Sequence, residues 1–327
     1  MKARIGIIGC RHGSTHAGNF SKIENGELVG ICDIDEHRLK QATDRFGCKG
    51  YEHYEKLLEK TKPQGVMVCT PPYVRMPLIQ DLAQRGIAVF CEKPPAGDME
   101  TARAARRALE KNPVINAVGF MYRWAQAADY IKSLIGGRPV VVCQITGIWE
   151  VLYWDVSTDY FYRDRAGGPL VEQGVHLIDV ARFVLEDEVD HVYARGGNLI
   201  HPLSDTFTTE ETIAVSMKWR KGTLGSHIHC WTHHGHIFEL LFTGVDFALT
   251  LDLKTNQVRG TDRGEPIDST FGDDYYVTEL SAFCDAILKN DQKLIRGSYA
   301  DSCHTLAAAA TAMQSIDLGA PLPVPHW

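Results

Sequence analysis

The chain has 327 residues, and its 41 acidic side chains outnumber its 34 basic ones to give a formal charge of −7. At about 150 residues per domain, this length predicts two domains that each bury a core of their own. The acidic balance argues against nucleic-acid binding, and no apolar run reaches the ~20 residues needed to cross a bilayer. The N-terminus enters a strand-like pattern at once and lacks a signal peptide, so we expect a cytoplasmic protein.

The first third of the chain alternates short apolar runs with stretches of helical spacing. The apolar runs predict strands over 3–9, 27–33, 65–70, 87–91 and 114–119. The helical stretches are 16–23, 35–46, 72–85 and 98–110, with Pro77 placing one helix start near Met76 or a kink there. Such alternation predicts an α/β domain over residues 1–120, built on a doubly wound parallel sheet.

The remaining residues, 121–327, have a different pattern. Helical spacing occurs over 124–135, 169–185, 275–288 and 298–316. Alternating strands are predicted over 138–150, 191–196, 211–219, 223–231, 236–243 and 246–253. Short turns such as Arg220-Lys221-Gly222 indicate a mostly antiparallel sheet, so this second domain is predicted to be α+β.

The nine cysteines form no C-x-x-C pair, and their number is odd. Four of them end apolar strand-like runs: Cys10, Cys32, Cys69 and Cys91. We expect these to be small buried side chains rather than disulfide partners or metal ligands, in keeping with a reducing compartment.

The first strand–turn–helix unit carries a dinucleotide-binding signal. Glycines in such a turn let the backbone approach a pyrophosphate, and an acidic residue ending the second strand accepts hydrogen bonds from the ribose. The turn starts at Gly9, but Arg11 and Ser14 replace the second and third glycines of G-x-G-x-x-G. Arg11 would either clash with the phosphates or pair with them. Asp33 ends the second strand and would repel a 2′-phosphate, which favours NAD over NADP; Asp35 competes for this role but is better placed to cap the next helix.

Residues suited to hydride-transfer chemistry lie after the fourth strand and on a predicted helix of the second domain. Lys93 lies after the fourth strand, at the edge of the sheet where ligands bind, and could hold a substrate oxygen; a solvated loop lysine is the plain alternative. Glu172 and His176 are four apart on a predicted helix, so the carboxylate could orient the imidazole for acid–base work, or the two could form an ordinary surface pair. The helix glycine Gly174 suggests close approach of a ligand or backbone. Asp179, one turn further on, is equally suited to substrate binding and to local capping.

These residues lie within motifs that occur together in a specific order. They are Thr70-Pro71-Pro72, Cys91-Glu92-Lys93-Pro94-Pro95, Gly119-Phe120-Met121-Tyr122-Arg123 and the run from Gly167-Gly168-Pro169 through Glu172 and His176 to Asp179. With the closing helix, they resemble the glucose–fructose oxidoreductase / inositol dehydrogenase / MocA (Gfo/Idh/MocA) family over nearly the whole chain. The resemblance implies an N-terminal Rossmann domain, a C-terminal α+β domain whose open sheet often forms oligomer contacts, and NAD(P)-dependent chemistry at a hydroxyl of a sugar, cyclitol or polyol.

The resemblance matches Lys93 and His176 to the family's catalytic lysine and histidine, with Glu172 where aspartate is more usual. We expect cofactor contacts from the residues Gly9, Cys10, Arg11, His12, Asp33, Thr70, Pro71, Pro72, Glu92 and Lys93. Substrate contacts are expected from Arg123, Tyr160, Arg163 and Asp179. A homo-oligomer, dimer or tetramer, is also expected.

Two further clusters allow more than one interpretation. His227, His229, His233, His234 and His236 could bind a metal, but they are better explained as histidines of a sheet face or interface, so no metal is predicted. The aromatic loop over 149–165 suits either a wall of a sugar site or an oligomer interface.

The leading hypothesis is therefore an NAD-dependent dehydrogenase of a sugar, cyclitol or polyol, in which Lys93 polarises the hydroxyl, His176 is the acid–base group and Glu172 orients it. One alternative is a glycosidase that uses held NAD for transient oxidation. Another is a regulator that binds a dinucleotide or sugar without catalysis, suggested by Arg11 in the phosphate turn.

Overall fold

The computed structural model describes the whole chain except residues 152–157, 273 and 327. The chain folds into two compact units. The first contains Met1–Ala96, Glu100–Met121 and Asp274–Ser302, and the second contains Gly97–Met99, Tyr122–Asp273 and Cys303–Trp327.

The first unit is built on a six-stranded parallel sheet of order β3-β2-β1-β4-β5-β6. Its strands are β1 (Ala3–Ile8), β2 (Gly26–Cys32), β3 (Gly50–Tyr51), β4 (Gly65–Val68), β5 (Ala88–Cys91) and β6 (Asn116–Val118). Strands β1, β4 and β5 are almost wholly buried, as expected for parallel strands with helices on both faces. The predicted doubly wound α/β sheet is confirmed.

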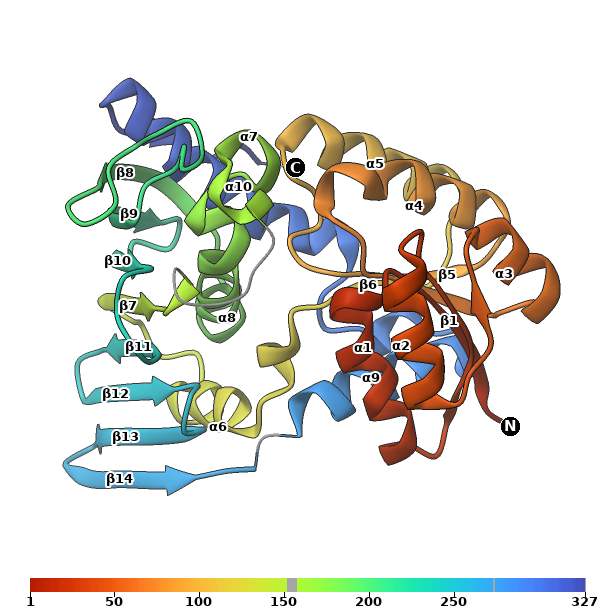
Figure 1. The fold of residues 1–327 in the computed structure, drawn as a ribbon. Helices are drawn as coiled ribbons and strands as arrows, with labels where there is room; N and C mark the ends of the chain where they lie inside the picture. Colours follow the sequence, from red (N-terminus) through yellow and green to blue (C-terminus); the bar gives the residue numbers. More distant parts are fainter. Residues whose placement is uncertain (152–157, 273, 327) are drawn as a thin grey trace. The chain divides into compact units, whose positions relative to one another are not determined.

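Helices cover both faces of this sheet (Figure 1). On one side lie α3 (Tyr54–Thr61), α4 (Arg75–Gln84) and α5 (Met99–Lys111); on the other lie α1 (Cys10–Asn19), α2 (Glu36–Phe46) and α9 (Tyr275–Lys289). Pro77 falls in the first turn of α4, close to the helix start that the sequence predicts. The short elements β3 and α3 are not among the predicted ones.

Helix α1 begins six residues earlier than the prediction of a helix over 16–23, which is wrong at its start. The helix follows Gly9 directly, and Gly9 provides no side-chain cap. The sequence therefore lacks the Ser, Thr, Asp or Asn that normally announces a helix start.

Helix α9 contributes to the core of the first unit although it comes late in the chain. Leu280, Phe283 and Cys284 are fully buried in one cluster with Ile5 and Ile7 of β1. The division made by contacts changes units after Met121, close to the boundary predicted near residue 120, but it assigns residues 274–302 to the first unit rather than to the predicted second domain. The apolar stripe of α9 shows that the helix packs on something but carries no mark of which sheet it covers.

The second unit contains a nine-stranded sheet of order β14-β13-β12-β11-β7-β10-β9-β8-β15. Its strands are β7 (Val142–Ile148), β8 (Val189–Gly197), β9 (Thr212–Trp219), β10 (Leu224–Cys230), β11 (Ile237–Thr243), β12 (Phe247–Asp252), β13 (Gln257–Asp262), β14 (Glu265–Thr270) and β15 (Leu322–Pro323). Strands β7 and β10 pair in parallel, whereas the other described pairs are antiparallel, so the predicted mostly antiparallel sheet is confirmed.

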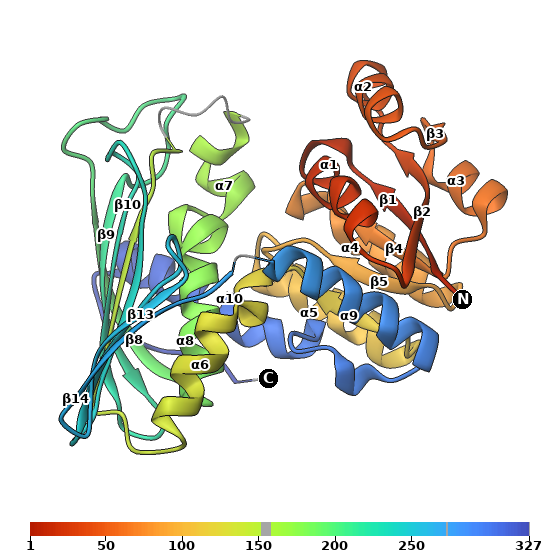
Figure 2. The ribbon, with the colours of Figure 1, turned by 90° about the horizontal axis from the view of Figure 1, so that it is seen from below.

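The helices of the second unit lie on one face of this sheet (Figure 2). They are α6 (Gln126–Ile135), α7 (Arg163–Ala166), α8 (Val175–Leu185) and most of α10 (Tyr299–Leu318). Strand β9 alternates exposed and buried residues along its length, which is typical of a sheet covered on one side. Short 3₁₀ turns occupy Phe20–Lys22, Pro72–Val74, Met121–Trp124, Thr158–Phe161 and Gln292–Leu294.

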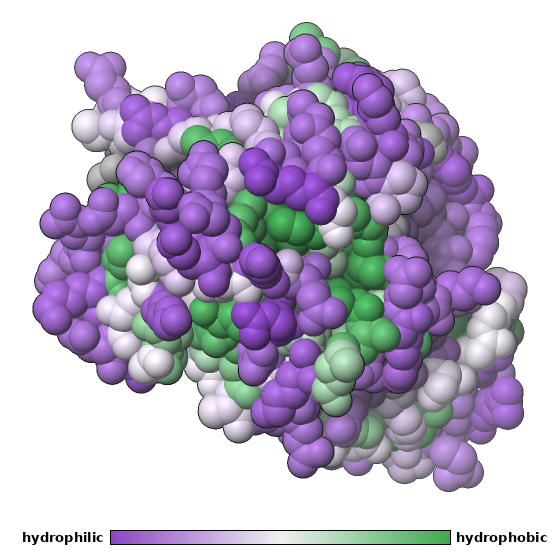
Figure 3. Space-filling view, turned by 90° about the vertical axis from the view of Figure 1, so that its right-hand side faces the viewer, coloured by the Kyte–Doolittle hydropathy of each residue, from purple (hydrophilic) through white to green (hydrophobic). Residues whose placement is uncertain are grey.

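The surface matches the composition of the chain. Most of the face drawn in Figure 3 is hydrophilic, with apolar residues gathered toward its middle. Among the described residues, no helix is both long enough and apolar enough to span a membrane. None of the nine cysteines forms a disulfide within the described residues, and Cys10, Cys32, Cys69 and Cys91 are buried as predicted.

Candidate cofactor and catalytic sites

The turn between β1 and α1 can be made only by glycine. Gly9 has φ +99°, and a Cβ on it would stand 2.8 Å from the backbone C and O of Cys69. This conformation and this contact each exclude a side chain. Helix α1 starts at the next residue without a side-chain cap, so its N-terminal turn presents backbone N–H groups to an anion.

Asp33 lies immediately after β2 and is 9% exposed. Its Oδ2 accepts a hydrogen bond from the Cys10 N–H at 2.6 Å, and its Oδ1 accepts one from the Asp35 N–H at 2.9 Å. A carboxylate has about four acceptor positions, so both oxygens can still accept ribose hydroxyls. Asp35 caps α2 by accepting a bond from the Arg38 N–H at 3.0 Å, which confirms the capping interpretation of this residue.

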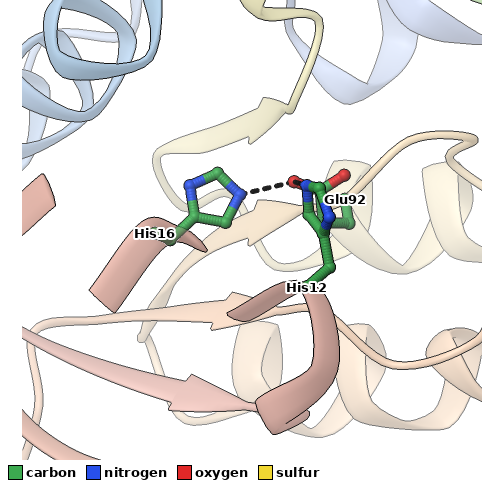
Figure 4. A group of neighbouring side chains, drawn as sticks. All are labelled: His12, His16 and Glu92. Carbon is green, nitrogen blue, oxygen red and sulfur yellow. Dashed lines mark hydrogen bonds and ion pairs between the residues drawn. The ribbon is translucent and has the colours of Figure 1, made fainter. Parts of the chain in front are cut away.

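Glu92 follows β5 and lies against two histidines of α1 (Figure 4). Its Oε1 is 2.5 Å from Nε2 of His16 and 3.4 Å from Nε2 of His12. Burial favours the neutral form of Glu92, but His12, His16 and Arg75 together hold the pKa of its carboxyl well below the usual range. His12 and Glu92 are among the residues expected near the cofactor; His16 is not, although the spacing His12-x-x-x-His16 puts both rings on one helix face.

Lys93 extends the same segment and is partly exposed, with its backbone N–H donating to Glu92 Oε2 at 3.0 Å. The loop is held by Arg75 of α4, which donates to the Thr70 carbonyl at 2.7 Å and to the carbonyls of Glu92 and Pro94. This buried arginine is not among the predicted site residues, because nothing in a helical pattern shows which basic side chain will hold a neighbouring loop. These bonds fix the backbone of Lys93 beside the carboxyl ends of β4 and β5.

The loop after β4 offers a further polar group. The Thr70 hydroxyl is buried and has no hydrogen-bond partner within the described part of the chain. Pro71 is exposed, and Pro72 opens a short 3₁₀ turn. A glycine-only turn and an acidic residue at the end of β2 are features of a dinucleotide site, and the buried Thr70 hydroxyl is available to a bound group. The residues of the first unit therefore fit this cofactor, and Arg11 lies exposed on the same turn.

In the second unit, Glu172 and His176 belong to two kinds of helix. Leu170–Gly174 forms a π-helical turn, and α8 starts at Val175, so the predicted helix over 169–185 is present with an altered first turn. Both side chains are nearly buried, at 5% and 8% exposure, and His176 packs edge-on against Tyr122 with 5.5 Å between ring centroids. A π-turn is frequent at functional sites, and spacing patterns do not reveal it.

Gly174 lies against neighbouring side chains that leave no room for a Cβ. A Cβ there would be 2.9 Å from Leu170 Cδ2 and 3.2 Å from His227 Cε1. The sequence analysis expected a ligand or backbone close to Gly174, whereas the groups that approach it in the structure are the side chains of Leu170 and His227.

The residues expected to contact substrate have specific partners within the second unit. Arg123 donates to both carboxylate oxygens of Asp179 at 2.6 and 2.7 Å, and Asp179 is fully buried. Arg163 bonds Glu210 at 2.8 Å and Asp317 at 2.9 Å. Tyr160 is half-buried in a 3₁₀ turn. These contacts give Arg123 and Asp179 a structural role, and their contact with substrate stays a prediction.

The histidine-rich segment covers β10, with His227 and His229, and the connection from β10 to β11, with His233, His234 and His236. His227 and His229 are fully buried on the helix-covered face, whereas Cys230 points the other way, as alternation predicts. Burial lowers the pKa of His227 to about 3 and that of His229 well below its usual value. Within the described residues, the only group of three side chains with metal-ligand atoms close together is His12, His16 and Glu92.

The aromatic loop over 149–165 is described only in part. Trp149 packs against Phe238 with 4.2 Å between ring centroids and against His229 at 5.0 Å, so it is a core residue. Tyr153 and Trp154 lie outside the described residues.

The six-stranded parallel sheet, the Gly9 turn and Asp33 define a dinucleotide-binding Rossmann domain. A family described as "Oxidoreductase family, NAD-binding Rossmann fold" matches residues 3–120, and the "GFO/IDH/MocA C-terminal domain" matches residues 125–247. The chain belongs to the Gfo/Idh/MocA family of oxidoreductases. It is thus a dehydrogenase of a sugar- and cyclitol-oxidising family, and its cofactor is NAD.

Several relatives resemble the chain over much or all of its length. An uncharacterised oxidoreductase YrbE of Bacillus subtilis is 24% identical over 98% of this chain and 96% of its own. The myo-inositol 2-dehydrogenase of Thermotoga maritima is 27% identical over 68% of this chain and 66% of its own. Among solved structures, an oxidoreductase domain protein from Kribbella flavida superposes with a TM-score of 0.89 at 19% identity, and both chains are covered completely. A levoglucosan dehydrogenase in complex with NADH and levoglucosan reaches 0.86 at 17% identity, also over both complete chains.

Proposed function

We propose that this protein transfers a hydride between NAD and a secondary hydroxyl of a sugar, cyclitol or related polyol. The proposal is carried by the occurrence, in one chain, of a turn that fits a dinucleotide and of Lys93, Glu172 and His176 in the motifs of the family. The names of two relatives, a myo-inositol 2-dehydrogenase and a glucose-6-phosphate 3-dehydrogenase, support this substrate class.

The chemistry assigns one task to each group. Oxidation of an alcohol requires loss of the hydroxyl proton, which His176 would accept as a neutral imidazole. The ammonium of Lys93 would stabilise the developing alkoxide, and Glu172 would orient the imidazole and stabilise its charged form. Bound NAD would take up the hydride in the oxidative direction. For reduction, the proton moves back from His176 to the substrate oxygen.

Asp33 supports NAD rather than NADP as the partner in this reaction. The carboxylate is fixed by two backbone N–H groups, so it cannot swing away from a 2′-phosphate without losing both bonds. A 2′-phosphate on the ribose would lie close to this fixed carboxylate, and the two negative charges would repel each other.

A homo-oligomer and a cytoplasmic location remain further parts of the proposal. The uncovered face of the nine-stranded sheet exposes Leu224 at 61% and Ile228 at 42%, and apolar side chains there suit contact with a second copy. Light scattering of the purified chain gives the number of copies directly.

The test is a kinetic one. A panel of free sugars and cyclitols is screened with NAD for NADH formation, and the best substrate is used with Lys93→Ala and His176→Ala. Each variant should lower kcat by about 100-fold or more. Lys289→Ala and His191→Ala, which remove exposed side chains of the same type, should retain normal turnover.

Three outcomes would contradict the proposal or favour an alternative. Normal turnover in Lys93→Ala or His176→Ala excludes the assigned roles. Cleavage of glycosides without net NADH would favour the glycosidase alternative, and dinucleotide binding without turnover of any polyol would favour the regulator.

A further inference from the structure

Two histidines of the first helix, one in its first turn and one in its last, lie beside a glutamate, as Figure 4 shows. His12 and His16 are four residues apart on α1, so their rings project from the same face of the helix. Glu92 reaches them from the end of β5. One ligand atom from each of the three side chains lies within 4.8 Å of the other two.

Because the group is buried, the negative charge of Glu92 must be balanced by nearby partners. The side chain of Glu92 is 3% exposed and that of His16 is 1% exposed, so water does little to solvate either one. A buried carboxylate is stable only with charged or hydrogen-bonding partners. Here the neighbours of Oε1 are two imidazole nitrogens, which are themselves metal ligands when neutral.

We propose that His12, His16 and Glu92 form a binding site for a divalent transition-metal ion, with zinc as the best match to these ligands. Two imidazole nitrogens and one carboxylate oxygen are a ligand set suited to zinc, whereas magnesium and calcium prefer oxygen ligands alone. The half-exposed His12 side chain, at 43% exposure, gives the ion a path from solvent.

The geometry needs only a small adjustment. Bonds of about 2.0–2.2 Å at tetrahedral angles place neighbouring ligand atoms roughly 3.4 Å apart. The distance from His12 Nε2 to Glu92 Oε1 is already 3.4 Å, whereas that from His16 Nε2 is 2.5 Å. Withdrawal of the Glu92 carboxylate by about 1 Å would open the space for the ion.

The neighbouring residues also suit a metal site. Glu92 Oε2 accepts a hydrogen bond from the Lys93 N–H at 3.0 Å, which fixes the orientation of the carboxylate in the way that outer-shell partners do. Three protein ligands leave at least one coordination position for water or for an oxygen of another molecule. The site thus has the open form of a reactive or ligand-binding zinc centre rather than the closed form of a structural one.

The test measures metal binding by the full chain without dinucleotide, so that it is independent of the proposed dehydrogenase activity. The protein is stripped with a chelator and titrated with ZnCl₂ by calorimetry and with CoCl₂ by visible absorption. We expect one ion per chain and the intense absorption of four-coordinate Co²⁺. His12→Gln should weaken binding by about 100-fold or more, since it removes a direct ligand whereas loss of an outer-shell partner costs about 10–100-fold. His37→Gln, at an exposed histidine of α2, should bind as the native chain does.

His16→Gln and Glu92→Gln serve as second variants, and circular dichroism and thermal unfolding establish that each is folded. The His12 side chain is partly exposed, so its variant keeps the test open if the buried substitutions unfold the chain. The proposal is overturned if the native chain binds no zinc, or if His12→Gln binds it with unchanged affinity.

Discussion

Asp33 accepts a hydrogen bond from the backbone N–H of Cys10, with 2.6 Å between Oδ2 and N. The bond joins the end of β2 to the first residue of α1, next to the point where Ile8 and Cys32 pair across the parallel strands. The carboxylate proposed to bind the ribose therefore also holds the turn that is proposed to bind the pyrophosphate. A change at Asp33 should affect both cofactor choice and the stability of the turn.

Asp33→Asn tests this double role. The substitution removes the charge that opposes a 2′-phosphate, so NADP should bind better relative to NAD. Affinity for NAD should fall by about 10-fold or more, because charged hydrogen bonds contribute about 1.5–3 kcal/mol. Fluorescence titration with both dinucleotides measures the ratio. Asp35→Asn, in the neighbouring helix cap, should leave the ratio unchanged; an equal shift there would show that charge in this region acts non-specifically.

Gly9→Ala should destabilise the fold more than another glycine substitution with a positive φ. Gly86 also has a left-handed conformation, at φ +71°, but a Cβ there meets no atom within 4 Å. Gly86→Ala should cost about 1–2 kcal/mol from backbone strain alone. Gly9→Ala adds the collision with the Cys69 backbone, so its loss in the free energy of unfolding, measured in urea, should be larger. Equal losses would mean that the turn moves aside without cost.

Removal of the buried ion pair should unfold the second unit readily. Asp179→Asn removes the buried carboxylate that lies 2.6 Å from Arg123 and 3.7 Å from Arg182, and breaking a buried ion pair costs about 3–5 kcal/mol. Thermal denaturation measures the loss. Asp44→Asn breaks an exposed pair with Lys40 on α2 and should change stability little. If Asp179→Asn kept native stability but lost turnover, the aspartate would be a substrate ligand instead.

The buried histidines predict a pH dependence of stability. The pKa of His227 is lowered to about 3 in the folded chain, against about 6.5 when unfolded. Between these values only the unfolded state binds the proton, so stability is complete above about pH 6.5 and falls as the pH drops toward 3. The slope from this residue approaches about 1.4 kcal/mol per pH unit.

His227→Leu should therefore flatten the acid side of the stability profile, measured as the urea midpoint from pH 7 to pH 5. At pH 7 the substitution should be neutral or stabilising, because both ring nitrogens of His227 lack hydrogen-bond partners among the described residues. His229 retains its own contribution. His37→Leu, on the surface of α2, should leave the slope as in the native chain; an unchanged slope in His227→Leu would contradict the assignment.

The regular parts of the fold could be predicted because the pattern of apolar residues sets them. The buried runs at β1, β4 and β5 and the alternation in β9 have the periods of covered and half-covered strands. Strands β13 and β14 escaped prediction because their exposed and polar residues leave no clear alternation. The helix α3 is short, and its apolar residues span only two turns.

The candidate site could be predicted only where local motifs mark it. Gly9, Asp33 and Lys93 lie at positions that any βα unit brings to one edge of the sheet. The pair Arg123–Asp179 joins residues 56 positions apart, and His16–Glu92 joins residues 76 apart. Such contacts depend on which helices and strands pack together, and the local patterns of a single sequence do not show this.

The packing of α9 in the first unit has a consequence for synthesis of the protein. Nearly half of the chain, 122–273, separates this helix from the sheet that it covers. At about 5–20 residues per second, a ribosome needs roughly 10–40 s to pass from residue 121 to residue 302. During that interval the side of β1 that Leu280 and Phe283 later cover lacks its final neighbour. The nascent dinucleotide domain should therefore depend on chaperones until translation is almost finished, and a fragment ending at residue 121 should aggregate.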